Sequence, residues 1–331
     1  MIQSDWLQVF KKKKIVVLGD VMLDEYLIGH VNRISPEAPV PIVSLEKEDL
    51  RLGGAANVAL NLKSLGIETY ICSIIGDDKD GESLLQLCKN QGIYSSGLQL
   101  VKNRKTTKKT RVLGNNQQLL RIDSEQINPI NAEEEQFILK YLKELFNNEI
   151  DALIFEDYDK GCLTPFLIKE VIQLCKKYNV ITTVDPKKNH FFNFQGVDLF
   201  KPNLKELKEG LNMDFNVIDN KEFNHAVEEL RLKLEHKITL ITLSEQGIYI
   251  NNGVKHFIVP AHLRNIADVS GAGDTVISVA TLCLLAGLSM ENIAEVANLA
   301  GGLVCEKSGV VSIVLEELIN ELEEKNISIS Y

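Results

Sequence analysis

Several common signatures are missing from this sequence of 331 residues. Its six cysteines form no CxxC pair and no Cys/His cluster with zinc-finger spacing, which argues against a structural zinc site. The six histidines are scattered, without an HExxH pairing, so none is expected to ligate a metal or to act in catalysis. We expect the cysteines to be reduced core residues, as in proteins of a reducing compartment.

Long hydrophobic runs and an excess of basic residues are lacking too. The longest apolar stretch, residues 276–288, is shorter than the roughly 20 residues that a transmembrane helix needs. The N-terminal segment has no apolar run long enough for a secretion signal, so a cytoplasmic protein with no membrane partner is predicted. A formal net charge of −10 argues against a nucleic-acid partner, because such proteins usually carry a basic surface.

Short apolar runs alternate with helical patterns along the chain. This alternation predicts an α/β fold: a mostly parallel central sheet, covered by helices on both faces, in one domain over residues 1–331. Strands are expected at 14–19, 69–75, 152–155, 180–185 and 237–244, and helices at 55–65, 81–90, 165–178 and 275–287.

Two segments break this alternation. Residues 31–50 contain three prolines and cannot form a helix. Residues 105–123 alternate between apolar and polar residues on both sides of a turn at 114–116, which is typical of a hairpin. They could be plain surface hairpins. Alternatively, they form a small β lid over an active site, with bounds of about 31–50 and 100–123.

The segment from Asp268 to Asp274, DVSGAGD, precedes the long apolar helical pattern. Small residues at Gly271, Ala272 and Gly273 allow close approach of a ligand, and the free N–H groups of the helix would bind a phosphoryl group. Asp274 in the first turn could then accept a proton from an attacking hydroxyl. Taken alone, the motif is equally compatible with a glycine turn followed by an acidic residue that the helix dipole favours.

The familiar nucleotide-binding fingerprints are absent: there is no GxxxxGK[ST], and no GxGxxG follows the first strand. That strand is followed instead by Asp24, which could bind two sugar hydroxyls at the carboxyl end of the sheet. Gly53 and Gly54 would let the sugar come close to the backbone at a second place. The side-chain amide of Asn57 could donate and accept hydrogen bonds there. A helix cap and a tight helix entry are the structural alternatives.

Polar and charged residues elsewhere in the chain indicate a binding site less specifically. Asn203 and Glu206 lie three residues apart on one helical face and could order the water shell of a magnesium ion, although such pairs are common on surfaces. Residues 102–111 hold six cations, of which one or two, such as Arg111, could clamp a sugar phosphate rather than remain solvated. Lys187 at a strand end is a further candidate.

The stretches LGGAANVALNLKSLG (52–66) and DVSGAGDTVISVA (268–280) resemble the two signature regions of the ribokinase-like (PfkB) carbohydrate kinases. Their order and the NxxE between them agree with that family over essentially the whole chain. The stretches GDVMLDEY (19–26), RISPEAPVPIV (33–43), NNQQLLRID (115–123) and DYDKG (157–161) most resemble the heptose-phosphate kinases within it. Ser270, Glu156 and Lys188 depart from the usual residues, which are Thr, Ser and Gly.

The resemblance implies ATP-dependent phosphorylation of a sugar phosphate, D-glycero-β-D-manno-heptose 7-phosphate, at its anomeric hydroxyl for lipopolysaccharide precursor synthesis. Another sugar, sugar-phosphate or nucleoside kinase of the family is the alternative, and a non-catalytic sugar or nucleotide sensor a remote one. The resemblance further implies Mg²⁺, a monovalent cation such as K⁺ near Asp268, and a homodimer formed through the lid. The adenine pocket would be built by Ser244, Glu245, Gly247 and Asn298. Because no HxGH motif is present, a fused nucleotidyltransferase activity is not expected.

Overall fold

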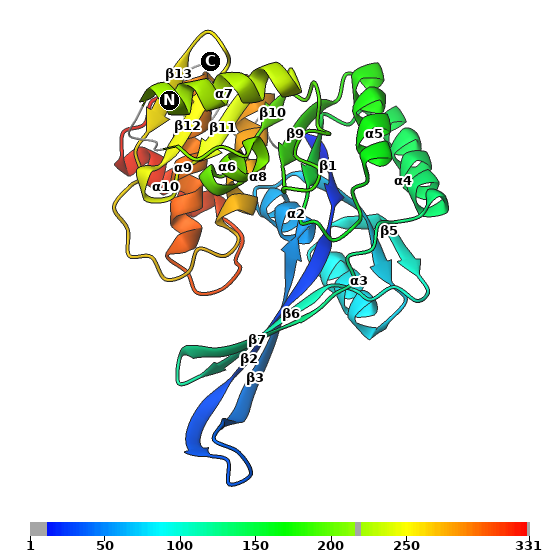
Figure 1. The fold of residues 1–331 in the computed structure, drawn as a ribbon, viewed down its shortest axis with the longest axis vertical. Coiled ribbons are helices and arrows are strands. Elements are labelled where there is room, and N and C mark those ends of the chain that lie inside the picture. Colours follow the sequence, from blue (N-terminus) through cyan, green and yellow to red (C-terminus); the bar gives the residue numbers. More distant parts are fainter. Residues whose placement is uncertain (1–11, 216–219, 330–331) are drawn as a thin grey trace.

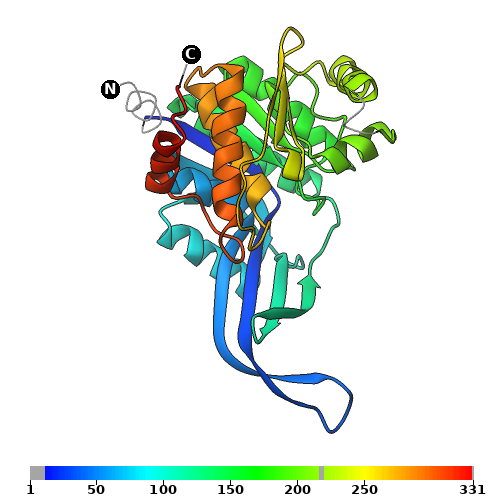
Figure 2. The ribbon, with the colours of Figure 1, turned by 90° about the vertical axis from the view of Figure 1, so that its left-hand side faces the viewer.

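The computed structural model describes residues 12–215 and 220–329; residues 1–11, 216–219 and 330–331 of the predicted single domain lie outside this description. The structure confirms the predicted α/β class. A nine-stranded sheet has the order β13-β12-β11-β10-β9-β8-β1-β4-β5, and a separate four-stranded sheet has the order β3-β2-β6-β7. Figure 1 shows the second sheet extending as an arm from the helix-covered body, and Figure 2 shows the length of this arm from the side.

The central sheet is parallel from β5 to β11, and only its last two strand pairs, β11–β12 and β12–β13, are antiparallel. Its strands are β1 (Lys14–Gly19), β4 (Glu68–Gly76), β5 (Tyr94–Val101), β8 (Ala152–Glu156), β9 (Ile181–Asp185), β10 (Leu199–Phe200), β11 (Ile238–Thr242), β12 (Ile248–Asn251) and β13 (His256–Val259). The five strands predicted from apolar runs correspond to β1, β4, β8, β9 and β11.

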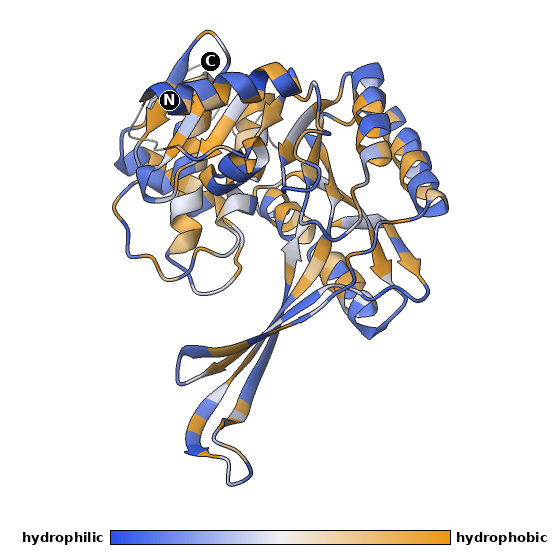
Figure 3. Cartoon of the chain, in the orientation of Figure 1, coloured by the Kyte–Doolittle hydropathy of each residue, from blue (hydrophilic) through white to orange (hydrophobic). Residues whose placement is uncertain are grey.

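Successive side chains of the buried strands point to opposite faces of the sheet and pack into two hydrophobic cores, one on each face. In β1, Ile15 and Val17 join one hydrophobic cluster, while Val16 and Leu18 join the other. The first core is closed by α2 (Ala55–Ser64), α3 (Lys79–Asn90), α8 (Ala272–Leu285), α9 (Met290–Cys305) and α10 (Leu315–Glu324). The second is closed by α4 (Ala132–Leu145), α5 (Pro165–Tyr178), α6 (Leu204–Leu211) and α7 (Asn220–Leu234). Figure 3 shows apolar strands between helices of mixed polarity.

The arm consists of β2 (Val21–Ile34), β3 (Pro41–Gly54), β6 (Lys108–Gly114) and β7 (Gln117–Ser124). β6 and β7 pair antiparallel around Asn115 and Asn116, both at positive φ, which confirms the predicted hairpin. The segment with three prolines forms the tip between β2 and β3 and the start of β3. The ranges 31–50 and 100–123 thus contribute to one sheet; whether this sheet acts as a lid is taken up under Proposed function.

All six cysteines are buried and unpaired, as expected for core residues. In the described part of the chain, no helix is both long and apolar enough to cross a bilayer.

Candidate active site

The loop after β8, the carboxyl end of β9 and the start of α8 meet at a cleft of about 1250 Å³. Parallel strands collect polar side chains at this edge because their buried runs end there together. Among the predicted residues, the cleft is lined by Lys187, Asn203, Glu206, Ser244, Glu245, Gly247, Gly271, Ala272, Gly273, Asp274 and Asn298. Residues up to 111 positions apart in the sequence, Lys187 and Asn298, therefore line one cleft.

Asp274 lies in the first turn of α8, and only 3% of its surface is exposed. Its Oδ2 accepts a 2.7 Å hydrogen bond from Asn57 Nδ2, and its Oδ1 accepts a 2.8 Å hydrogen bond from the hydroxyl of Tyr158. Burial raises the pKa of Asp274 to about 6, against the lowering effect of these two hydrogen bonds. The carboxylate is therefore oriented, ionised near neutral pH, and basic enough to accept a proton.

Tyr158, in the loop after β8, was not identified from the sequence as a site residue. Asp20 holds this loop by accepting hydrogen bonds from the backbone amides of Tyr158, Lys160 and Cys162, at 2.9 to 3.0 Å. Asp20 therefore shapes the loop instead of facing a ligand. Burial first, and then Asp274 as a neighbouring charge, raises the pKa of Tyr158, so its hydroxyl stays a donor.

The loop before α8 turns at Gly271, whose φ of 82° is costly for residues with a Cβ. A Cβ at Gly271 would also approach Asn57 Nδ2 to 2.9 Å. The Ala272 amide donates to the carbonyl of Val269 at 3.3 Å, whereas the amides of Gly271 and Gly273 have no acceptor among the described residues. Two of the three predicted amide donors are thus available to an anion at the start of α8.

Two further carboxylates lie beside Asp274. Glu156 and Asp185 are the last residues of β8 and β9 and pair with each other in the parallel register, so their side chains share one face. One carboxylate oxygen from each of Glu156, Asp185 and Asp274 lies within 4.8 Å of the others. Lys201, itself buried, forms a 2.8 Å ion pair with Asp185 Oδ2. Glu156 was noted in the sequence only as a departure from the family.

Asn203 and Glu206 form a reciprocal cap at the start of α6. Asn203 Oδ1 accepts from the Glu206 amide, and Glu206 Oε2 accepts from the Asn203 amide, both at 2.8 Å. Glu206 Oε1 also forms an ion pair with Lys187, which lies 5.2 Å from the ring centre of Tyr158. Burial alone would lower the pKa of Lys187, but Asp185 and Glu206 raise it, so Lys187 is cationic. Lys187 thus lines the large cleft, and its distance from the Tyr158 ring centre equals that of Lys109.

The far end of the cleft contains the residues expected around an adenine. Ser244 and Glu245 belong to the 3₁₀ turn Ser244–Gln246, and Gly247 follows it at a φ of 94°. A Cβ at Gly247 would come within 2.0 Å of the Val259 carbonyl, so this close approach requires glycine. Asn298 donates from α9 to the Pro260 carbonyl at 2.8 Å and thereby connects the helix to the loop that borders the cleft.

Asp268 connects two loops near the start of α8. Its carboxylate accepts hydrogen bonds from the amides of Ser270, at 2.9 Å, and Gly309, at 3.1 Å. Burial would raise the pKa of Asp268, but these hydrogen bonds lower it below its ordinary value. Asp268 is therefore an anion that organises both loops, and such an anion could also serve a bound cation.

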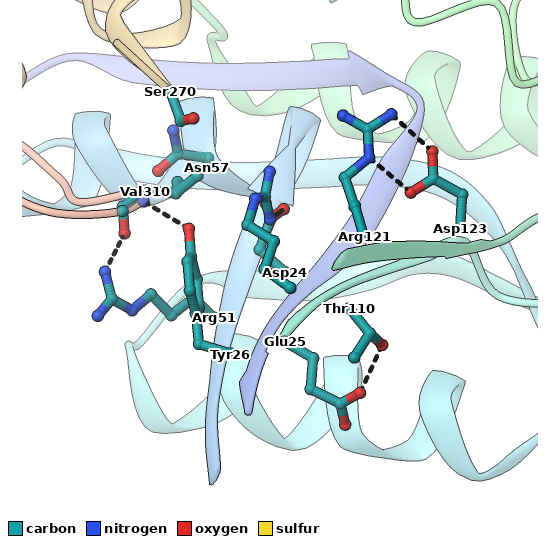
Figure 4. A network of polar contacts seen from close by, with 12 residues as sticks. Asp24, Glu25, Tyr26, Arg51, Asn57, Thr110, Arg121, Asp123, Ser270 and Val310 are labelled. Carbon is teal, nitrogen blue, oxygen red and sulfur yellow. Dashed lines mark hydrogen bonds and ion pairs between the residues drawn. The ribbon is translucent and has the colours of Figure 1, made fainter. Parts of the chain in front are cut away.

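Asp24, which is buried, forms an ion pair with the half-buried Arg111 between β2 and β6 at the base of the arm. Gly53 is opposite Met22 in the β2–β3 register, and a Cβ there would meet Asp24 Oδ2 at 2.1 Å. Gly54 caps α2 at a φ of 56° and so leads the chain directly to Asn57. Figure 4 shows Asp24 and Asn57 in this network, together with the Tyr26–Val310 and Arg121–Asp123 contacts. The predicted sugar ligands therefore lie together, connected to Asp274 through Asn57.

The structure separates the six cations of the predicted basic segment. Arg104 donates to the carbonyls of Asn128 and Lys160, and Lys108 pairs with Asp80 and Glu25. Lys109 alternates with Lys108 along β6 and has no ion-pair partner among the described residues. Its Nζ lies 5.2 Å from the ring centre of Tyr158, and burial lowers its pKa. A half-buried lysine beside Asp24 that makes no ion pair with the described residues is a candidate anion ligand, and the sequence alone could not single it out.

A buried base at a glycine-rich helix start, set between a large cleft and a carboxylate–guanidinium pair, is typical of enzymes that phosphorylate alcohols. The described structure thus has the features of a phosphotransferase. Residues 12–317 match the model of the pfkB family carbohydrate kinases, and this chain belongs to that family. Kinases of this family use ATP and, in general, Mg²⁺.

Curated relatives share this sequence over most of its length. The bifunctional protein HldE of Campylobacter fetus subsp. fetus is 37% identical over 94% of this chain. The proteins of the same name from Helicobacter pylori and Citrifermentans bemidjiense are 39% and 40% identical over 92% and 93% of it. The chain spans 67%, 65% and 63% of the length of these three relatives.

Solved structures share the fold at lower sequence identity. Phosphofructokinase-2 from Escherichia coli, in complex with potassium, matches with a TM-score of 0.76 at 19% identity, over 95% of this chain and 99% of that chain. Ribokinase from Arabidopsis thaliana, with ribose and ATP, matches with a TM-score of 0.70 at 18% identity, over 93% and 98%. These similarities confirm the ribokinase-like architecture.

Proposed function

We propose that this chain transfers the γ-phosphoryl group of ATP to the anomeric hydroxyl of D-glycero-β-D-manno-heptose 7-phosphate, giving the 1,7-bisphosphate. The observation that carries the proposal is the position of Asp274: its carboxylate is held by Asn57 on the sugar side and lines the large cleft on the other. The relatives of 37% to 40% identity support a shared activity. The product class is a precursor for lipopolysaccharide synthesis.

In this mechanism Asp24 accepts hydrogen bonds from the sugar hydroxyls, and the ion pair with Arg111 holds its carboxylate in place. Gly53 and Gly54 let the sugar approach the backbone, and Asn57 positions both the sugar and Asp274. Lys109 binds the phosphate that the sugar already carries. Asp274 then removes the proton of the anomeric hydroxyl as that oxygen attacks the γ-phosphorus of ATP. The bond from this phosphorus to the bridging oxygen of the β-phosphate breaks, and ADP leaves.

The amides of Gly271 and Gly273 stabilise charge on the transferred group, and Lys187 and Lys201 supply positive charge on the same wall. Ser244, Glu245, Gly247 and Asn298 border the space for the adenine. The carboxylate of Glu206 keeps lone pairs beyond its cap and its contact with Lys187, so it fits a role in holding Mg²⁺ through water. Mg²⁺ supplies charge neutralisation on the phosphates when it is bound. Asp268 would support a monovalent cation, such as K⁺, beside the loop.

We further propose that the arm closes over the sugar and pairs with the arm of a second copy. β7 is exposed on both faces at the edge of its sheet, and Leu120 and Ile122 are 55% and 50% exposed. Exposed apolar side chains on an unpaired edge strand favour burial against a partner. A homodimer in light scattering that Leu120→Glu with Ile122→Glu converts to a monomer would support this; a monomeric wild type would contradict it.

The test of the activity is a substrate panel with ATP and Mg²⁺, read as ADP release and by phosphorus NMR of the product. The panel holds the heptose 7-phosphate, fructose 6-phosphate, sedoheptulose 7-phosphate, ribose, adenosine and the heptose without its phosphate. We expect the heptose 7-phosphate to give the highest kcat/KM and an anomeric phosphate signal. A higher kcat/KM for any other acceptor would refute the substrate assignment.

A further inference from the structure

A group of metal-ligating side chains that the proposed reaction does not use joins two loops of the described structure. Its members are Asp157, Asp159 and His190. Asp157 and Asp159 flank Tyr158 in the loop after β8, and His190 belongs to the segment after β9. One ligand atom from each of the three lies within 4.8 Å of the others. Spacing in the sequence does not reveal this group, because the two loops become neighbours only in the folded sheet.

The group lies on the opposite face of the central sheet from Asp274. Side chains alternate along β8, so Ile154 packs into the core that α8 closes and Phe155 into the other core. The Asp157 amide continues the sheet by donating at 3.0 Å to the carbonyl that ends β9, which directs the Asp157 side chain to the face of Phe155. None of the three residues is among those that line the large cleft. The group is therefore separate from the carboxylates beside Asp274.

The distances within the group fit a tetrahedral metal ion. Nδ1 of His190 lies 3.3 Å from Asp157 Oδ2 and 3.8 Å from Asp159 Oδ1. Direct charge-assisted hydrogen bonds are shorter, at about 2.7 to 2.9 Å. Nitrogen and oxygen ligands bound tetrahedrally at about 2.0 to 2.2 Å from an ion lie roughly 3.3 to 3.6 Å from one another. Small side-chain shifts would therefore bring both measured distances to the spacing of a bound ion.

One carboxylate of the group is incompletely satisfied. Asp159 Oδ1 is buried and has no hydrogen-bond partner among the described residues. Asp157 is fully buried, and its Oδ1 accepts a 2.9 Å hydrogen bond from the Asp159 amide, which leaves Oδ2 to face His190. Burial first, and then the charge of Asp157, raises the pKa of Asp159. The two carboxylates thus lack full compensation where they face the imidazole.

The charges around the group favour a cation. Two carboxylates face one imidazole, which opposes them only when it is protonated. Asp20 and Lys187 also act on the group from neighbouring elements, and their opposite charges cancel. With a neutral imidazole the group carries a charge of −2, which one divalent cation would neutralise. A set of one imidazole and two carboxylates suits Zn²⁺ better than Mg²⁺, which prefers oxygen ligands alone.

We propose that Asp157, Asp159 and His190 bind one Zn²⁺ ion, with water as its fourth ligand. The ion would connect the loop after β8 to the segment after β9 and so stabilise the fold. Because two of its ligands flank Tyr158, the ion would also hold the residue that donates to Asp274; this consequence, unlike the site itself, rests on the proposed function. A protonated His190 between the two carboxylates is the alternative that the test has to exclude.

The probe is Zn²⁺ alone, titrated into the metal-free full chain without ATP or sugar and followed by competition with a chromophoric chelator. Excess Mg²⁺ is present, because it occupies all-carboxylate sites and competes little for a site that contains imidazole. All six cysteines are buried, so they offer no accessible thiolate to the metal. We expect one bound Zn²⁺ per chain and a Tm that rises with Zn²⁺.

Two variants test the ligands. His190→Gln and Asp159→Asn should each weaken Zn²⁺ binding by at least about tenfold and abolish the rise in Tm, since even groups that only hydrogen-bond to a metal ligand are worth about 10- to 100-fold in affinity. Asn tolerates the φ of 56° at residue 159, so the second variant preserves the loop. His256→Gln, which removes an exposed histidine of β13, should leave binding unchanged.

The outcomes separate the ion from the protonated histidine. The proposal is overturned if the wild-type protein binds no Zn²⁺, or if either ligand variant, shown to be folded by circular dichroism, binds it as tightly as wild type. It is equally overturned if His256→Gln weakens binding as much as His190→Gln does. Since the titration contains neither substrate, its failure is distinct from failure of the kinase assay.

Discussion

The hydroxyl of Tyr158 donates a 2.8 Å hydrogen bond to Asp274 Oδ1, although the two residues are 116 positions apart in the sequence. Tyr158 belongs to the loop after β8, and Asp274 to the first turn of α8. The contact therefore joins the two elements that border the proposed reaction centre. Because it is a hydrogen bond to the charged form of the carboxylate, it controls how readily Asp274 accepts a proton.

Replacing Asp274 with Asn should lower kcat by roughly 10²- to 10⁴-fold, since general-base help is worth about that much. The side chain keeps its size and can still bond to Asn57, so the fold should be preserved. Single-turnover rates measure the effect, and circular dichroism checks the fold. Wild-type turnover in this variant would remove Asp274 from the mechanism.

The same variant should be more stable than wild type at alkaline pH. Asp274 has a folded pKa of about 6, raised from 3.8, so its ionised form is penalised by burial. The penalty is absent below the unfolded value and complete above the folded one, where it reaches at most about 3 kcal/mol. Urea denaturation should therefore show a gain for Asp274→Asn near pH 8 that disappears near pH 4. An equal gain at both pH values would contradict the assignment.

Tyr158→Phe should move the acidic limb of the pH–rate profile to higher pH. Turnover is expected to rise with pH through about 6 as Asp274 ionises, and losing the Tyr158 hydrogen bond raises that midpoint. The measurement is kcat as a function of pH, with divalent cation supplied only in the amount that ATP binds. Tyr178→Phe should leave the midpoint unchanged, because Tyr178, the last residue of α5, packs against Phe146.

Asp24→Asn should raise KM for the sugar and leave KM for ATP nearly unchanged. The variant removes a carboxylate that accepts sugar hydroxyls and leaves Arg111 without its buried partner, so kcat/KM should fall by about 10- to 100-fold. Glu25→Gln is the matched control, because Glu25 points to the other face of β2 and bonds to Thr110. If both variants behave alike, the sugar does not bind at Asp24.

Lys109→Met should lower the preference for a phosphorylated acceptor. Its apolar stem can still pack beside Tyr158, but the charge is lost, so kcat/KM for the sugar phosphate should fall by at least about tenfold. The ratio of kcat/KM for the sugar with and without its phosphate is the measurement. Lys108→Met, which removes the neighbouring lysine that pairs with Asp80, should leave this ratio unchanged.

Much of the fold could be predicted from the sequence because the parallel strands are buried on both faces and appear as short apolar runs. The helix over Pro165–Tyr178 has its expected bounds since Thr164 caps it and Pro165 starts it. Asp274 and Asn57 were both identified, but their hydrogen bond was not, because it joins elements more than 200 residues apart. Glu156 and Asp185 end two strands, and only knowledge that those strands are neighbours would have paired them.

The base of the arm is anchored to the loop at residues 308–310. Val310 N–H donates to the hydroxyl of Tyr26 at 2.9 Å, and Arg51 donates to the Val310 carbonyl at 2.9 Å, as Figure 4 shows. These anchors immobilise the first third of β2 against the body. Any swing of the arm must therefore pivot farther out, where the β2–β3 register shifts at Ile28/Gly29. Asp24, which we propose to bind the sugar, then stays in place while the tip moves.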